Sequence, residues 1–236
     1  PDNGIDDDGN GYVDDYYGYD FANVDGDPMD DNGHGTHCAG TIGAVGNNAV
    51  GVVGVNWQVR IMAVKFLDAG GGGWYSDAIN AVEYAWRNGA RISNNSWGGY
   101  GYSQGLYDAF MAAKSVNHLA IAAAGNYGLD NDEWPHYPSS FDLDNIIAVA
   151  ASDRNDELTA WSNYGETSVD LAAPGASIYS TVPGNGYSSY SGTSMSTPHV
   201  AGVAALLLAQ NPSLSFSMVR QMILNATDPK ESMEGL

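Results

Sequence analysis

Residues 192–202 read Gly-Thr-Ser-Met-Ser-Thr-Pro-His-Val-Ala-Gly and open a run of small and apolar residues that continues to Ala209. Such a run predicts a buried helix over residues 194–209 that begins after a glycine turn. Pro198 fits its first turn, where a missing N–H costs little. A serine at this helix end lies beside unpaired N–H groups and the positive end of the helix dipole. Ser194 is therefore a candidate nucleophile, with a simple N-cap as the alternative.

A second pattern places a histidine between two glycines where a loop enters a helix. Residues 32–40 read Asn-Gly-His-Gly-Thr-His-Cys-Ala-Gly. The glycines allow other backbone to approach the ring of His34, as a general base requires. A plain turn histidine is the alternative, as is a metal pair of His34 and His37. The spacing of three and the absence of a neighbouring glutamate argue against the usual zinc motif.

A third pattern is an asparagine just beyond an apolar run. Residues 122–126 read Ala-Ala-Ala-Gly-Asn. An amide at the end of a buried strand can donate its N–H to an oxygen that develops negative charge, so Asn126 is a candidate oxyanion donor. The alternative is an asparagine that only shapes a turn.

The rest of the chain alternates strand-like and helix-like segments. We expect strands over 16–21, 59–66, 92–97, 119–124 and 146–151, and helices over 35–45, 76–88, 104–117, 194–209 and 215–226. Ser76 is the expected N-cap of its helix and Gly89 the residue that ends it, while the glycines at 70–73 indicate a mobile loop. Alternation of this kind predicts an α/β fold of three layers, with a mostly parallel central sheet and helices on both faces. Sites in such folds lie at the carboxyl ends of the strands, where the three patterns fall.

Composition limits the classes of function. The chain has 236 residues, which fits one domain over 1–236, and its net charge of −20 repels nucleic acid and anionic lipid. The charge suits a cation such as calcium, although an acidic surface also serves solubility. Cys38 is the single cysteine, so no disulfide forms within the chain, and we expect it to be a packed side chain. No signal peptide or membrane-spanning run is evident.

Calcium is also indicated by residues 6–15, which resemble the first half of an EF-hand loop. The expected oxygen ligands are Asp6, Asp8, Asn10, the carbonyl of Tyr12, Asp14 and Asp15. Tyr17 stands where the closing glutamate of an EF-hand would be, so another acid must complete the site. Carboxylates this close together repel one another without a cation, but a solvated acidic loop is the alternative. A further cluster of Asp25, Asp27, Asp30 and Asp31 fits a metal site or plain surface equally well.

Taken together, the three patterns and their order resemble the histidine, asparagine and serine motifs of the subtilase family of serine proteases, and the resemblance runs from about residue 3 to about residue 228. It implies a subtilisin-like fold and a serine endopeptidase that acts through an acyl-enzyme, with His34 as base, Ser194 as nucleophile and Asn126 as oxyanion donor. Without water-excluding loops to judge from, a peptide ligase on the same scaffold is not separated from a hydrolase.

The resemblance also implies where substrate and calcium bind. Ser96, Trp97 and Gly98 would form one wall of the primary specificity pocket, and Ala124 and Gly125 the other. Trp97 stands at a commonly aliphatic position. These small, uncharged residues predict broad specificity with an apolar or aromatic residue before the cleaved bond. A second calcium loop is implied, with ligands from Gly46, Asn48, Val50 and Val52 together with Asp15.

One member of the family's catalytic triad, an aspartate that ends a buried apolar strand, is not evident. Asp2 lies at a suitable distance before His34, but no apolar strand precedes it. We therefore expect the aspartate strand to lie upstream of this chain, and the family's closing C-terminal elements to be missing as well. The chain is then a fragment of an active enzyme, or else a peptide-binding pseudoenzyme. From the resemblance we expect a secreted monomer that acts on protein or peptide substrates, with a pro-segment as inhibitor and without nucleic acid or membrane partners.

Overall fold

The centre of the molecule is a sheet of four parallel strands in the order β3-β4-β5-β6. The computed structural model describes residues 3–233 and residue 235. The strands are β3 (Ile92–Asn95), β4 (Leu119–Ala123), β5 (Ile146–Ser152) and β6 (Leu171–Pro174). Every residue of β4 and β5 is buried, as expected of strands covered on both faces.

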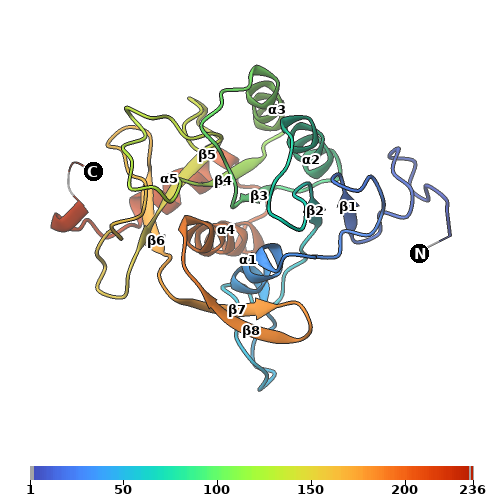
Figure 1. Cartoon of the computed structure of the whole chain (residues 1–236), viewed down its shortest axis with the longest axis horizontal. Helices are drawn as coiled ribbons and strands as arrows, with labels where there is room; N and C mark the ends of the chain where they lie inside the picture. The colour runs from blue at the N-terminus through green and yellow to red at the C-terminus, as the bar shows by residue number, and fades with distance from the viewer. Residues whose placement is uncertain (1–2, 234, 236) are drawn as a thin grey trace.

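Successive residues of β4 supply two separate cores. Ala120 and Ala122 belong to a cluster with α2 (Tyr75–Arg87) and α3 (Gln104–Ser115). Leu119 and Ile121 belong to a second cluster with α4 (Thr193–Gln210) and α5 (Phe216–Asn225). Helices therefore cover both faces of the sheet, which confirms the predicted three-layer α/β fold (Figure 1).

Two smaller sheets flank this centre. The strands β1 (Gly18–Asp20) and β2 (Ala63–Lys65) pair in parallel, and β7 (Ile178–Val182) and β8 (Gly186–Tyr190) form an antiparallel hairpin. The helix α1 (His34–Gly43) lies between α4 and the hairpin, and a short 3₁₀ helix, η1 (Glu231–Met233), follows α5 near the end of the chain (Figure 1). In the described part of the chain, β2 and β3 are not paired with each other, so each keeps one free edge.

Most predicted elements are confirmed, with shifted ends. The predicted strand over 59–66 is regular only from Ala63 to Lys65, and β6, β7 and β8 are not among the predicted strands. The prediction that Ser76 caps α2 is wrong, because Trp74 is the N-cap and the Ser76 hydroxyl contacts Asp77 instead. Gly89 follows the helix with φ +87°, as predicted for the residue after a C-cap.

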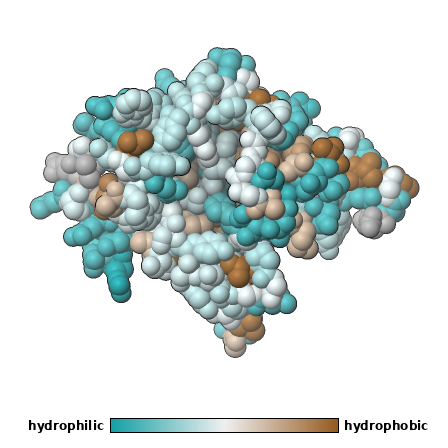
Figure 2. All heavy atoms as spheres, viewed as in Figure 1, coloured by the Kyte–Doolittle hydropathy of each residue, from teal (hydrophilic) through white to brown (hydrophobic). Residues whose placement is uncertain are grey.

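The face drawn in Figure 2 is mainly hydrophilic or neutral, and its most hydrophobic side chains gather toward the N-terminal segment. Two exposed side chains of that segment are Ile5 and Val13. None of the helices within the described ranges is both long enough and apolar enough to cross a membrane.

Candidate active site

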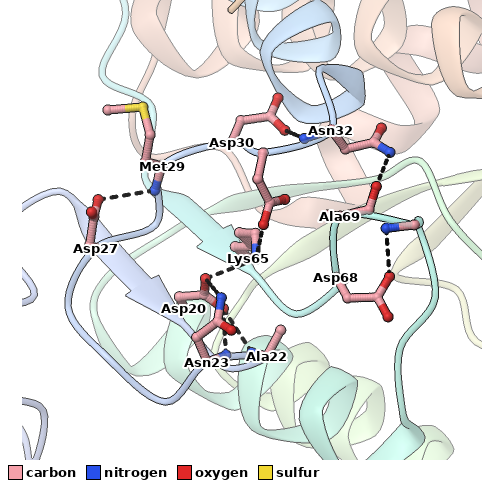
Figure 3. Close-up of polar contacts among 12 residues, drawn as sticks. Asp20, Ala22, Asn23, Asp27, Met29, Asp30, Asn32, Lys65, Asp68 and Ala69 are labelled. Atoms are coloured by element: carbon pink, nitrogen blue, oxygen red, sulfur yellow. Dashed lines mark hydrogen bonds and ion pairs between the residues drawn. The ribbon is translucent and has the colours of Figure 1, made fainter.

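His34 is the first residue of α1, and the loop before it is fixed by one carboxylate. Asp30 accepts hydrogen bonds from the N–H groups of Gly33 and Thr36 at 2.8 and 2.7 Å and from the Thr36 hydroxyl at 2.6 Å. Gly33 has φ 103°, a left-handed conformation that suits glycine. The Asn32 amide donates to the Ala69 carbonyl at 2.9 Å and so ties this loop to the one after β2 (Figure 3). These contacts hold the backbone on both sides of His34 and so fix the position from which its side chain extends.

The imidazole of His34 is half-buried and is held by no carboxylate among the described residues. Burial lowers its pKa below the ordinary value, the Asp30 carboxylate opposes that effect, and the neighbouring His37 adds to it. The ring is therefore neutral near pH 7 and able to accept a proton. No described side chain hydrogen-bonds the ring, so its tautomer is not fixed by a partner.

Ser194 is the second residue of α4, which places it at the same end of the molecule as His34. Cys38, one helical turn after His34, contacts the Ser194 carbonyl with its Sγ at 3.4 Å. The same carbonyl accepts from the Ser96 hydroxyl at 2.8 Å. The Ser194 hydroxyl donates to the Ser96 carbonyl at 3.2 Å rather than to His34. His34 and Ser194 thus lie in the first turns of two packed helices, but the Ser194 hydroxyl bonds to Ser96 and not to the His34 ring.

Asn126 meets the N-terminus of α4 through its side chain. Its Oδ1 accepts from the N–H of Thr193 at 2.8 Å and from the Thr193 hydroxyl at 3.0 Å. These two bonds occupy the amide oxygen and leave the Asn126 Nδ2 group available as a donor. A carbon atom added at the α-carbon of Gly192 would lie 3.7 Å from each of three atoms: Asn126 Nδ2, Asn126 Oδ1 and the Ser194 nitrogen. Two N–H donors therefore border one region of space beside Ser194, together with the Asn126 Oδ1 that already accepts from Thr193.

The five residues that the sequence predicts as pocket walls follow two adjacent strands. Ser96, Trp97 and Gly98 come directly after β3, and Ala124 and Gly125 come after β4. Because β3 and β4 are parallel neighbours, both segments leave the same edge of the sheet. The Trp97 ring packs edge-on against Phe66 with centroids 4.8 Å apart, so much of this side chain contacts the core.

Sequence reasoning did not identify four polar residues that shape this region: Thr193, Asn131, His136 and Asn163. The Asn163 Oδ1 accepts from the N–H groups of Tyr127 and Leu129 at 2.9 and 3.2 Å, while its Nδ2 donates to the Asn131 Oδ1 at 2.9 Å. These contacts hold the loop that carries Asn126. They join positions far apart in the chain, and no local sequence signal indicates them.

The acidic loop over 6–15 supplies oxygen atoms, but most of them face N–H groups of the loop. Asp6 accepts from the N–H groups of Gly9, Asn10 and Gly11 at 2.7, 3.2 and 2.9 Å, which lowers its pKa. Asp14 accepts from the N–H of Gly4 at 2.8 Å, and Asp8 from that of Asn10 at 3.1 Å.

Other predicted ligands have structural contacts of their own. Asp15 accepts from the Tyr84 hydroxyl at 2.6 Å and from the Asn10 amide at 2.8 Å, and the Tyr12 ring packs against Tyr84. In the second loop, formed by Gly46, Asn48, Val50 and Val52, the Asn48 Oδ1 accepts from the Val50 N–H at 3.0 Å. Residues 3–233 and 235 contain no group of three or more His, Cys, Asp or Glu side chains arranged to hold a metal ion. Carboxylate and amide oxygens of this kind are the ligands that calcium prefers. In the structure, however, these oxygens accept hydrogen bonds from N–H groups of their own loops and so close turns.

A buried ion pair lies beneath the histidine loop. Lys65 on β2 donates to Asp20 on β1 at 2.9 Å and lies 3.5 Å from Asp31 (Figure 3). Asp20 is 1% exposed. Asp2, the alternative for the triad aspartate, lies outside the described residues.

Comparisons with known proteins identify the family of the chain. The model of the subtilase family matches residues 2–235. Thermitase of Thermoactinomyces vulgaris is 44% identical over 211 residues, which cover 89% of this chain and 73% of thermitase. A thermophilic serine proteinase of Bacillus sp. (strain AK1) is 47% identical over 193 residues, 82% of this chain and 47% of that protein.

A crystal structure of a cold adapted subtilisin-like serine proteinase superposes with a TM-score of 0.83 at 36% identity, over 92% of this chain and 76% of that one. A family model that spans nearly the whole chain and a shared fold at this level of identity establish the relationship. The chain belongs to the subtilase family of serine endopeptidases.

Proposed function

We propose that this chain forms the catalytic core of an endopeptidase that cleaves peptide bonds through an acyl-enzyme on Ser194. The observation that carries the proposal is the pair of N–H donors, Asn126 Nδ2 and the Ser194 nitrogen, each 3.7 Å from one point beside Gly192, while the equidistant Asn126 Oδ1 is already bonded to Thr193. Donors that face the place where negative charge develops are a large source of rate acceleration in acyl transfer.

In the proposed reaction His34 accepts the proton of the Ser194 hydroxyl as Oγ bonds to the substrate carbonyl carbon. The carbonyl oxygen becomes negative and is held by Asn126 Nδ2 and the Ser194 N–H. His34 then protonates the leaving amine, and a water molecule releases the acyl group by the reverse steps. The Ser194 hydroxyl must first rotate away from the Ser96 carbonyl that it contacts at 3.2 Å.

The proposed substrate is an extended peptide that lies along the segment after β3 and pairs with its backbone. The walls formed by Ser96 to Gly98 and by Ala124 and Gly125 carry no charge. We propose broad specificity for an uncharged residue before the cleaved bond, apolar or aromatic. The packing of Trp97 against Phe66 supports a wall that is rigid at this position.

The aspartate that orients His34 is proposed to come from outside the described residues, either as Asp2 or on a strand that is not part of this chain. Two observations support a strand. Both β2 and β3 keep a free edge in the described part of the molecule, and the ring of His34 has no carboxylate partner there. A strand between those edges would pair with both, and an aspartate at its carboxyl end would reach the site. Residues 1–236 would then form one catalytic domain that such a strand completes.

We further propose that calcium stabilises the loops over 6–15 and 46–52, since both offer the oxygen atoms that calcium prefers. Calcium would act on the fold, while His34, Ser194 and Asn126 carry the chemistry. The net charge of −20 favours a monomer that stays in solution. From the family we propose secretion, protein or peptide substrates and a pro-segment as inhibitor.

A second candidate function is that of a peptide-binding module without chemistry. It is favoured by one observation, namely that no described carboxylate contacts His34. The binding segments after β3 and β4 would be used in the same way, but bound peptides would remain intact.

The test is hydrolysis of a peptide p-nitroanilide by the chain alone and after addition of a synthetic apolar strand that ends in Asp-Ser-Gly. The matched control strand ends in Asn-Ser-Gly. We expect hydrolysis to rise with the first strand only. Absence of hydrolysis in both mixtures, while the peptide still binds, would support the binding module instead.

A further inference from the structure

Two glycines of the proposed pocket walls face the same side chain. A carbon atom added at Gly98 would lie 2.2 Å from His136 Cε1, and one added at Gly125 would lie 2.5 Å from Asn163 Nδ2 and 3.3 Å from His136 Cδ2. The imidazole therefore rests against the α-carbons of both glycines. His136 comes from the long connection between β4 and β5, and it occupies the space between two segments that follow different strands.

Neighbouring groups fix this ring in place. Its Nδ1 lies 3.1 Å from the Ser139 hydroxyl, and the His136 N–H donates to the Ser140 hydroxyl at 3.1 Å. Tyr100 packs against the ring edge to face, with centroids 5.4 Å apart. His136 is only 6% exposed. An imidazole held on three sides is part of the wall and does not swing freely out of the space.

The backbone beside the ring is tied to the segment after β3. Gly99 and Tyr137 exchange two hydrogen bonds, with the Gly99 N–H donating at 2.9 Å and the Tyr137 N–H at 2.7 Å. The distance between Gly98 and His136 is thus set by backbone pairing as well as by side chains. A substrate side chain that enters between Gly98 and Gly125 meets His136 at a fixed depth.

The ring carries no charge at neutral pH. Burial lowers the pKa of His136 to about 4, against the opposing effect of the Ala123 carbonyl. Neither a cationic nor an anionic side chain would find an opposite charge there, and burying an unpaired charge is costly.

We propose that His136 forms the floor of the primary specificity pocket and restricts it to peptides with a short, uncharged side chain before the cleaved bond. The inference rests on the proposed function and narrows it. The walls alone would admit an aromatic ring, whereas the imidazole occupies the space that such a ring needs. In an apolar pocket each methylene that fits or fails to fit changes discrimination by roughly 10- to 200-fold.

The test compares two peptidyl diphenyl phosphonates that differ only in alanine or phenylalanine before the reactive phosphorus. The rate at which each labels Ser194 is measured for the unchanged chain, for His136→Gly and for His136→Gln. We expect the unchanged chain and His136→Gln, which keeps a side chain of similar size, to react at least about tenfold faster with the alanine reagent. His136→Gly should lose or reverse that preference. Equal preference in the unchanged chain and in His136→Gly would overturn the inference.

A binding measurement separates this result from failure of the proposed chemistry. Calorimetric titration with Ala-Ala-Pro-Ala and Ala-Ala-Pro-Phe, both with free carboxylates, reads the pocket without any reaction. If the phosphonates do not label the chain but His136→Gly gains affinity for the phenylalanine peptide, the pocket assignment stands and the chemistry fails. If the variant binds both peptides as the unchanged chain does, the pocket assignment is wrong.

Discussion

Replacing Lys65 by methionine should destabilise the fold, because it leaves the Asp20 carboxylate buried without its cation. Lys65 Nζ lies 2.9 Å from Asp20, whose side chain is 2% exposed, and 3.5 Å from Asp31, which is 43% exposed (Figure 3). Methionine keeps most of the apolar stem of lysine, so the change removes mainly the charge. The pair with Asp31 contributes little because that carboxylate is solvated.

The size of the effect follows from what remains around Asp20. A buried charge that loses its only partner costs about 3–5 kcal/mol, whereas the loss of one hydrogen bond to a charged group costs about 1.5–3 kcal/mol. Asp20 still accepts from the N–H groups of Ala22 and Asn23 and from the Asn23 amide, at 2.8, 3.0 and 2.8 Å. We therefore expect a loss of about 2–3 kcal/mol in the free energy of unfolding at pH 7, near the lower range. For a domain of this size that is a fall of roughly 4–12 °C in Tm.

The pH dependence gives the prediction its sign. Burial alone would raise the pKa of Asp20, but the hydrogen bonds from Lys65 and Asn23 outweigh it, and the pKa in the folded state lies below 3.8. A lowered carboxyl pKa contributes stability above pH 3.8, and that contribution is lost as pH falls through the folded-state value. The difference between Lys65→Met and the unchanged chain should therefore be full at pH 7 and shrink below about pH 4.

Urea denaturation at pH 7 and at pH 3 measures both quantities. The double variant Asp20→Asn with Lys65→Met is the matched control. It also removes the Asp20 charge, which Lys65→Met leaves buried without a cation, and it should therefore recover part of the lost stability. A single-variant loss under about 0.5 kcal/mol at pH 7, or one that is the same at both pH values, would refute the reasoning.

Three further predictions concern the site and its loops. Asn126→Leu should lower turnover by about 10²–10³-fold, the range found for removal of such a donor in subtilisin, and steady-state kinetics at unchanged Tm would check it; a change under tenfold would contradict the role. Because burial lowers the pKa of His34 below 6.5, the rate of Ser194 labelling should rise with pH and reach half its maximum below pH 6.5; a midpoint above 6.5 would contradict the assignment. Chelation of calcium should lower Tm, and calcium at 100 times its Kd should restore about 2.7 kcal/mol of the free energy of unfolding. Asp8→Asn should weaken this response. A Tm that does not change with calcium would show that the two loops do not bind it.

The helices were predictable from sequence because their signals are local. The run of small residues after Ser194 and the left-handed Gly89 each fix a helix boundary through backbone geometry that neighbouring residues determine. The buried strands β4 and β5 were evident for the same reason, since every residue in them is apolar or small. The hairpin β7–β8 was not, because its strands mix serine, tyrosine and glycine and are stabilised by packing against α1.

Site residues could be predicted from the sequence only where the signal lies in neighbouring residues. His34, Ser194 and Asn126 each lie in a motif whose local form indicates their chemistry. His136 and Thr193 act through contacts with residues far away in the chain, and nothing beside them distinguishes them from packed polar residues. For Ser76 the sequence signal was misleading, since Trp74, two residues before the serine, takes the cap position.

Reaction with a fluorophosphonate probe, followed by peptide mapping, tests the central claim most directly. Ser215→Ala is the matched control, because Ser215 also stands at the start of a helix, where its hydroxyl oxygen caps the Met218 N–H at 3.2 Å. We predict that the folded chain is labelled at Ser194, that Ser194→Ala abolishes labelling, and that Ser215→Ala leaves it unchanged. A folded chain that stays unlabelled both alone and with the added aspartate strand, or one labelled at a different serine, would contradict it.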